Sequence, residues 1–324
     1  MHTIKVSHVA KRFGETQAVA DVSFDVERGE IFGLLGPNGA GKTTTIRMML
    51  DIFKPDCGTV SILDGPMSEE KKERIGYMPE ERGLYQDAPL ERCLLYLASL
   101  KGLPSGEARQ RLGALLERFD LAAHKSKKIK ELSKGMQQKA QIINTILHRP
   151  EMVVIDEPFA SLDPINTQLV KDLMRELRGQ GATILMSTHQ MHQVEELCDR
   201  ILLIDEGEDV LYGNLDEIRR RFSGHAVLVR VAGELPTVAG VEQVAPHNNA
   251  LKLTLAEDTA PQDVLQALIA QGVTLEKFEI AVPTLDEIFI RVVEGTCPEP
   301  SAHVLDGQYR VPGPEDQGLA EGGD

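Results

Sequence analysis

The chain has 324 residues, enough for about two domains, and 42% of them are hydrophobic, which is typical of a globular protein. Its formal net charge of -15 argues against a protein that wraps nucleic acid or adheres to an anionic membrane surface. The four cysteines lack CxxC spacing and fit a reducing compartment. No apolar run approaches the roughly 18–20 residues that span a bilayer. We therefore expect a soluble, cytoplasmic protein.

The N-terminal part predicts strands followed by a loop and a helix. Alternating apolar and polar residues in TIKVSHV (3–9) and AVADVSFDVERGE (18–30) predict edge strands of an antiparallel sheet. EIFGLLG (30–36) predicts a short buried strand, after which come a glycine-rich loop and a helical pattern over 43–53. This part of the chain therefore combines an antiparallel sheet with the start of an α/β unit.

Later segments extend the α/β pattern. Buried strands are predicted in MVVIDE (152–157) and ATILMSTH (182–189), with a helical pattern over 166–181 between them. Strands that alternate with helices predict a parallel α/β core. Residues 88–145 are helical in pattern instead, which predicts a helical subdomain inserted into that core. Its helical runs are 91–102, 107–121 and 136–148.

The composition shifts near Phe222. We expect one domain over residues 1–222 and a small α+β domain over 223–293. The Pro, Gly and acidic residues of 294–324 predict a disordered acidic tail, because they cannot bury enough apolar surface to order the chain. The small domain is expected to contain strands over 226–232, 250–256 and 274–281, and helices over 261–272 and 284–293.

A phosphate-binding loop is the most specific motif. GPNGAGKTT (36–44) matches G-x-x-x-x-G-K-[ST], follows a predicted strand and opens a predicted helix, as the motif requires. Its glycines let backbone N–H groups face phosphate oxygens. Lys42 is expected to reach the β- and γ-phosphates, and the Thr43 hydroxyl to ligate Mg²⁺. The nucleotide-binding residues predicted in this loop are Gly36, Asn38, Gly39, Ala40, Gly41, Lys42, Thr43 and Thr44.

An acidic pair ends the predicted strand at 152–157. Asp156 follows four apolar residues and is expected at the carboxyl end of a parallel strand, where ligands bind in open α/β sheets. We expect it to act on Mg²⁺, directly or through water. Glu157 is expected beside the γ-phosphate, as the general base that polarises the attacking water. ATP and Mg²⁺ are thus the predicted cofactors.

Further motifs resemble those of ATP-binding cassette (ABC) ATPases, in the same order, over residues 1 to about 220. LSKGMQQKA (132–140) resembles the family's signature motif, SLDP (161–164) its D-loop and STHQM (187–191) its switch histidine. KRFG (11–14) places an aromatic ring where the family stacks one on adenine. The resemblance assigns nucleotide contacts to Phe13, Ser133, Gly135 and Asp163, and catalysis to His189.

The resemblance also implies partners. In the family, the signature motif completes the ATP site of a second cassette, and the chain holds one phosphate loop and one signature, so we expect it to pair with a copy or with a related chain. Lys134 and Met136 replace the family's usual Gly and Gln, while Ser133 and Gly135 remain. A separate polytopic membrane permease is the other expected partner, which implies a location on the inner face of the cell membrane.

The C-terminal part, which ends in VPTLDEIFIRVVEG (282–295), resembles the accessory domain of the exporter branch that includes sodium-extrusion, drug-efflux and other ABC-2-type systems. GYMPEERGLY (76–85) resembles the same branch. It places Glu80 where the family normally has a Gln that reaches Mg²⁺ and the attacking water, and where the loop that senses the membrane partner begins. We expect Glu80 to act in Mg²⁺ binding, catalysis and coupling, and Glu81 to be solvated or paired with Arg82.

The preferred interpretation is the ATP-hydrolysing subunit of an exporter for an ion, drug or other small substrate. The alternative is a soluble cassette that acts on ribosomes or nucleic acid. Such proteins usually carry two cassettes or a long coiled coil, and often basic surfaces, so the single acidic cassette here argues against it. A catalytically dead regulatory cassette is disfavoured because Lys42, Asp156, Glu157 and His189 are all present. His189 and His192 are three apart, but no Cys or acidic cluster accompanies them to suggest a metal site.

Overall fold

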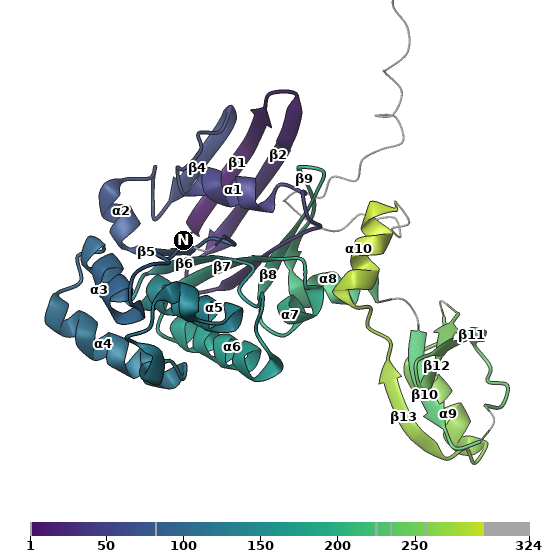
Figure 1. Ribbon diagram of the computed structural model, residues 1–324. Coiled ribbons are helices and arrows are strands. Elements are labelled where there is room, and N and C mark those ends of the chain that lie inside the picture. The colour runs from purple at the N-terminus through teal and green to yellow at the C-terminus, as the bar shows by residue number, and fades with distance from the viewer. Residues whose placement is uncertain (1, 82, 224–225, 234, 257, 295–324) are drawn as a thin grey trace, which may run out of the picture. The chain divides into compact units, whose positions relative to one another are not determined.

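The computed structural model describes residues 2–81, 83–223, 226–233, 235–256 and 258–294 (Figure 1). Two compact units divide after Asn214. The boundary predicted from sequence lies after Phe222 instead, and the difference is helix α8 (Leu215–Phe222), which contacts α10 (Leu285–Val293) of the second unit. The predicted acidic tail, from residue 295 onward, lies outside the described residues.

The first unit is built on a nine-stranded sheet in the order β4-β1-β2-β9-β8-β3-β7-β6-β5. Strands β3, β5, β6, β7 and β8 are parallel to their neighbours in this group, whereas β1 pairs antiparallel with β2 and β4. This confirms the mixed α/β class. The strands are β1 (His2–Phe13), β2 (Thr16–Glu27), β3 (Ile31–Leu35), β4 (Cys57–Ile62), β5 (Ile75–Met78), β6 (Met152–Asp156), β7 (Thr183–Thr188), β8 (Arg200–Asp205) and β9 (Glu208–Asn214).

The strands β1 and β2 are not edge strands of the sheet, contrary to the prediction. β4 covers the outer side of β1, and β2 joins the core through the parallel pairing of Asp21 with Glu208 in β9. The edge strand β4 is short and contains Gly58 at φ 83°, so its sequence gives little indication of a strand. The antiparallel strands therefore extend the same sheet that carries the parallel core.

Helices α3, α4 and α5 contact one another and form a helical block beyond edge strand β5 (Figure 1). α5 begins at the Ser133 cap and contacts β5, so the block is joined to the strand that precedes Glu80. The helices of this unit are α1 (Lys42–Met49), α2 (Glu69–Glu73), α3 (Leu90–Leu100), α4 (Ser105–Arg118), α5 (Lys134–Ile146), α6 (Pro164–Gly179) and α7 (Met191–Glu195), with 3-10 turns at Ala122–His124 and Ile129–Glu131. None of the described helices is both long and apolar enough to cross a membrane.

The core of the first unit is aliphatic with a few aromatic rings. Phe24 and Phe32 stack with ring centroids 5.5 Å apart, among buried residues such as Ile46 and Val154. Burial of such side chains stabilises a fold by about 1.5–3 kcal/mol each. The strands β3 and β6 are buried along their whole length, so the loops that follow them start from fixed points.

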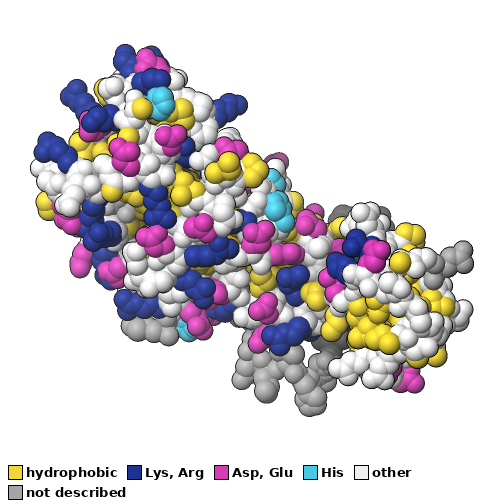
Figure 2. Space-filling view, turned by 90° about the horizontal axis from the view of Figure 1, so that it is seen from below, with side chains coloured by type: hydrophobic (Ala, Val, Ile, Leu, Met, Phe, Trp, Pro, Cys, Tyr) yellow, Lys and Arg dark blue, Asp and Glu magenta, His cyan; other side chains and the backbone are white. Residues whose placement is uncertain are grey.

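The second unit contains a four-stranded antiparallel sheet in the order β11-β12-β10-β13. One face of the sheet packs on α9 through Val227, Val229, Leu253, Val264 and Leu268. Its elements are α8, β10 (Ala226–Val231), β11 (Val241–His247), β12 (Ala250–Leu255), α9 (Pro261–Ala270), β13 (Leu275–Ile280) and α10. This is a small α+β unit with its own apolar core. Figure 2 shows acidic and basic side chains interspersed on the face of the molecule in view.

Candidate active site

The loop between β3 and α1 forms the phosphate-binding turn. Gly36, Gly39 and Gly41 have φ values of 146°, 86° and 107°, in the region that side chains other than glycine rarely adopt. A Cβ at Gly36 would lie 2.1 Å from the backbone oxygen of Ile204, so the loop also needs glycine there for space. Gly41 caps α1 at its N-terminus. The glycines therefore allow the tight turn that brings the loop backbone to the N-terminus of α1.

Lys42 bends back over this loop. Its Nζ donates hydrogen bonds to the backbone oxygens of Gly36 and Pro37, both at 2.8 Å. Burial lowers the pKa of the Lys42 ammonium below its ordinary value of 10.5, while the negative charges of Glu157, Asp156 and Glu80 act in the opposite direction. A cation at the start of α1 that lies near three carboxylates is suited to bind phosphate oxygens accompanied by a divalent cation.

Asp156 ends β6 and contacts the start of α1. The Thr43 hydroxyl donates to Asp156 Oδ2 at 2.8 Å, and the Ser187 hydroxyl, at the end of β7, donates to Asp156 Oδ1. Asp156 and Ser187 are buried. The hydroxyl and carboxylate predicted to share Mg²⁺ therefore lie in direct contact.

Glu157 lies next to Asp156 with a positive φ of 52°. Its Oε2 accepts a hydrogen bond from the Thr188 hydroxyl at 3.0 Å, and its Oε1 accepts one from the backbone N–H of His189 at 3.0 Å. His189 Nδ1 lies 2.7 Å from the same Oε1. The strained backbone is held in place because Gln138 of α5 donates to the Glu157 carbonyl at 3.2 Å. The carboxylate is thus oriented and paired with the predicted switch histidine.

These groups surround one cavity of about 310 Å³. Most of the residues predicted for the site line it, and Ala18, which the sequence did not single out, lines it too. The lining residues are Ala18, Asn38, Gly39, Gly41, Lys42, Thr43, Thr44, Glu80, Asp156 and Glu157. Gly36 and Ala40 shape the loop without lining the cavity, and His189 reaches it through Glu157.

Four other predicted residues lie outside the cavity. Ser133 caps α5, with its hydroxyl accepting from the Met136 N–H at 3.3 Å. A Cβ at Gly135 would lie 3.0 Å from the Ser161 carbonyl oxygen, so the signature and the SLDP segment are neighbours. Asp163 caps α6 by accepting from the Asn166 N–H at 2.9 Å, which lowers its pKa. Phe13 is 44% exposed at the end of β1, against the edge of Phe53.

Sequence reasoning missed the groups that hold the acids in place. Ser187 and Thr188 orient Asp156 and Glu157, and they directly precede the histidine that the resemblance identified. Two glutamines of α5 donate to the backbone beside the acidic residues. Gln138 donates to the Glu157 carbonyl, and Gln141 donates to the Glu81 carbonyl at 3.0 Å. Polar residues on the buried face of a predicted helix could have indicated them.

Glu81 pairs with Arg47 at 3.5 Å. The predicted alternative partner, Arg82, lies outside the described residues.

The fold and the cavity define an α/β protein of the P-loop nucleotide-binding class. A model described as ABC transporter matches residues 19–160, and a model described as ATP-binding protein DrrA1-3-like, C-terminal domain, matches residues 213–293. The chain belongs to the family of ABC transporter ATP-binding proteins. Its cassette therefore binds ATP and acts as an ATPase.

Similar proteins span nearly the whole chain. An uncharacterized ABC transporter ATP-binding protein of Bacillus subtilis, YhaQ, is 40% identical over 293 residues, covering 90% of this chain and 98% of the relative. The daunorubicin resistance ATP-binding protein DrrA3 of Streptomyces coeruleorubidus is 31% identical, covering 89% and 95%. The solved structure of an ATP-binding subunit of an ABC transporter has a TM-score of 0.64 and 35% identity, covering 68% of this chain and 93% of its own.

Proposed function

We propose that this chain is the ATP-hydrolysing subunit of an ABC-2-type exporter and drives efflux of a small substrate through a separate membrane permease. The observation that carries the proposal is the joining of the cassette to a DrrA-like C-terminal domain, in the arrangement of a drug-resistance relative that the chain covers to 95%. The geometry of the cassette cavity supports the hydrolytic part of this function.

In this proposal, the chain's own residues bind and orient ATP and the attacking water. Lys42 and the backbone N–H groups of the loop bind the phosphates, because they form a positively charged cradle at the start of α1. Glu157 accepts a proton from the attacking water, since its carboxylate lies at the cavity and is oriented by Thr188 and His189. Phe13 lies at the end of β1 and is proposed to stack on adenine.

Mg²⁺ fits the donors present. Thr43, Asp156 and Glu80 offer only oxygen ligands, the type that Mg²⁺ prefers, and the first two are already 2.8 Å apart. When bound, the ion would neutralise charge on the phosphates. Glu80 is an anion in this set, so it is proposed to hold the hard cation at least as well as an amide would.

A second cassette is proposed to complete the site. Ser133 and Gly135 open α5 beside the SLDP segment, outside the cavity lined by Lys42. A helix start of this kind suits an anion, so the signature of one chain is proposed to meet the γ-phosphate bound by the other, with Asp163 at the junction. The second cassette is a copy of this chain or a related one. The assembly is proposed to sit at the inner face of the cell membrane, through its permease.

One experiment tests hydrolysis, and a second separates export from action on ribosomes or nucleic acid. The purified chain is expected to release phosphate from ATP only when Mg²⁺ is present. A Glu157→Gln variant carrying a tag should be fractionated with ATP from cells of the source organism. We expect the variant in the membrane fraction, and we expect its presence there to require one polytopic membrane protein. Sedimentation with ribosomes instead would favour the alternative, which Figure 2 does not support, because basic side chains form no continuous stripe on the face in view.

Replacing Glu80 by alanine is expected to lower ATPase activity, or its coupling to transport, several-fold. Glu80 lines the nucleotide cavity and its charge acts on Lys42, so it can contact both the ion and the water. Glu81 serves as the matched control because it is the next residue, 84% exposed, and pairs with Arg47. An exposed pair of this kind is worth at most about 1 kcal/mol, so Glu81→Ala should behave as wild type.

Phosphate release and vesicle transport with the permease would measure both variants. Glu80→Gln should recover much of the activity, since an amide can still ligate the ion through its oxygen. Equal, near-wild-type rates for Glu80→Ala and Glu81→Ala would remove Glu80 from the proposed site.

A further inference from the structure

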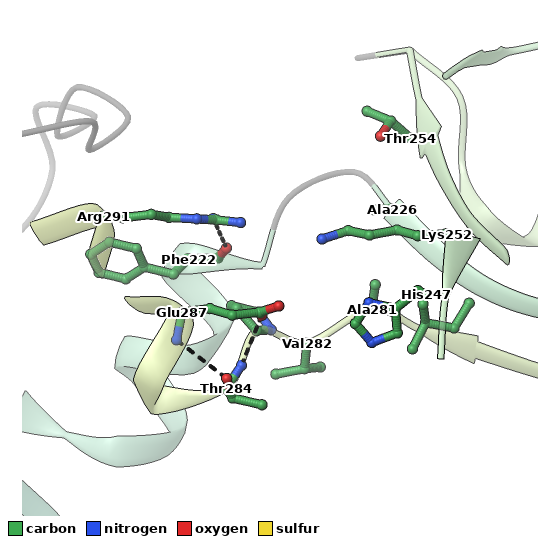
Figure 3. A pocket seen from close by; sticks show the side chains of 12 residues that line it. Phe222, Ala226, His247, Lys252, Thr254, Ala281, Val282, Thr284, Glu287 and Arg291 are labelled. Carbon is green, nitrogen blue, oxygen red and sulfur yellow. Dashed lines mark hydrogen bonds between the residues drawn. The ribbon is translucent and has the colours of Figure 1, made fainter. Parts of the chain in front are cut away.

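The second unit contains a cavity of its own, of about 200 Å³ (Figure 3). It lies between the sheet face that α9 does not cover and the helices α8 and α10. Its apolar wall includes Phe222, Leu228 and Val282, and its polar wall includes Lys252, His247 and Arg291. The volume is below the range of about 300–1,000 Å³ typical of drug-sized ligands, so the cavity suits a smaller molecule.

Lys252 is a half-buried cation for which the described residues supply no counterion. Its cross-strand neighbours in β10 and β11 are Leu228 and Ala245, which carry no charge. Among the residues that the structure describes, no carboxylate lies within ion-pairing distance of it. Figure 3 shows its side chain extended from β12 into the cavity. An ammonium group that is partly desolvated and unpaired is favourable for an anionic ligand.

Arg291 adds a second cation from the opposite side. Its guanidinium donates to the Phe222 carbonyl oxygen at 3.3 Å, a bond that fixes it at the cavity wall (Figure 3). His247, on β11, can donate a further N–H group. The cavity lining thus contains two cations and a histidine against one acid, Glu287.

The acids near the cavity are engaged elsewhere. Glu287 accepts the Thr284 N–H at 3.1 Å and belongs to the capping box of α10, where the helix start favours its charge. Glu279 lies on the same sheet face, across from Leu228, but it pairs with Lys277 at 2.7 Å. Neither carboxylate therefore neutralises Lys252.

We propose that this cavity binds a small organic anion. Its phosphate or carboxylate group would lie against the Lys252 ammonium and the Arg291 guanidinium. An attached apolar group would lie against Phe222 and Leu228. The cavity is too small for a whole nucleotide, so this ligand differs from the substrate of the cassette. The inference does not depend on the export function proposed above.

Phenyl phosphate is a suitable probe, with phenol as its neutral counterpart. Calorimetry on the full chain, with the cassette saturated by ADP and Mg²⁺, should detect phenyl phosphate with a dissociation constant of about 1 mM or below and no binding of phenol. Lys252→Gln should weaken binding about tenfold, because a hydrogen bond to a charged group is lost. The double variant Lys277→Gln/Glu279→Gln is the matched control on the same sheet face and should bind as wild type, since it removes a neighbouring ion pair as a unit and leaves no unpaired acid.

A single tryptophan locates the probe, because the chain has none. Val282→Trp places one at the cavity wall, and its fluorescence should change saturably with phenyl phosphate and less so when Lys252→Gln is added. Thermal unfolding checks that each variant is folded. Absence of binding to the wild-type chain, or equal affinities of the Lys252→Gln variant and the Lys277→Gln/Glu279→Gln variant, would overturn the proposal.

A soluble metabolite and a lipid headgroup share this chemistry. Flotation with phosphatidic acid vesicles, against phosphatidylcholine vesicles, distinguishes them. Vesicle binding that depends on Lys252 would assign the site to a headgroup. Binding of phenyl phosphate without vesicle binding would assign it to a soluble anion.

Discussion

Glu157→Gln is expected to reduce ATP turnover by about 10²–10⁴-fold while the affinity for ATP changes little. The carboxylate lies at the cavity, and its Oε1 accepts both the His189 N–H and, at 2.7 Å, a contact from His189 Nδ1. Glutamine has the same shape, so it keeps one of these acceptors, but it cannot take a proton from water. The contacts that Lys42 is proposed to make with phosphate come from the loop before α1 and should persist.

Phosphate release, equilibrium binding of ATP and size exclusion with light scattering would measure this variant. If ATP closes a pair of cassettes and hydrolysis opens it, the variant should accumulate as a dimer when ATP and Mg²⁺ are present. Glu117→Gln is the control, because Glu117 is an exposed acid on α4 away from the cavity. Turnover at the wild-type rate would remove Glu157 from the role of general base.

The parts of the fold that sequence predicted are those with strong local signals. The strand β3, the loop to α1 and the strand β6 were predicted almost to the residue, because each apolar run has the length of a strand and is bounded by glycine or acids, which favours a strand over a buried helix. α1 is shorter than predicted. It ends at Met49, and Asp51, with φ 60°, turns the chain out of the helical conformation.

The strands that sequence did not identify include the edge strands β4 and β11 and the interior strands β8 and β9, whereas the edge strand β13 was predicted. β11 contains Pro246, which usually argues against a strand, but it lies at the edge of its sheet, where a residue without an N–H is tolerated. β4 is likewise an edge strand and starts with Cys57 and a glycine of positive φ. Their pairing depends on neighbours far away in the chain, so periodicity alone cannot predict them.

The residues of the site could be predicted from local motifs, but the hydrogen bonds between distant segments could not. Thr43 and Asp156 are 113 residues apart in the chain. Sequence could place them together only because both motifs predict binding of Mg²⁺. The contacts of Gln138 and Gln141 with the backbone after the acids need the packing of α5 against β5. Their position on the buried face of a predicted helix marks both glutamines as unusual, but it does not say which backbone groups they contact.

Lys42→Met is expected to weaken ATP binding about 100-fold. The Lys42 ammonium is the cation of the phosphate loop, and hydrogen bonds to charged groups contribute about 1.5–3 kcal/mol each, so the loss of two phosphate contacts at the low end of that range amounts to about two powers of ten. Titration calorimetry with ATP would measure it. Lys54→Met is the control, since Lys54 is 80% exposed and pairs only with Asp51.

The same variant should unfold at a temperature no lower than the wild type at neutral pH, which separates lost binding from lost folding. The pKa of Lys42 is lowered in the folded protein, so the folded state holds this proton less tightly than the unfolded chain, and the charge costs stability at neutral pH. That cost falls as the pH rises from the lowered pKa toward 10.5. Any advantage of methionine in the free energy of unfolding should therefore shrink over the same pH range. ATP affinity equal to that of the wild type, measured on a folded variant, would exclude Lys42 from phosphate binding.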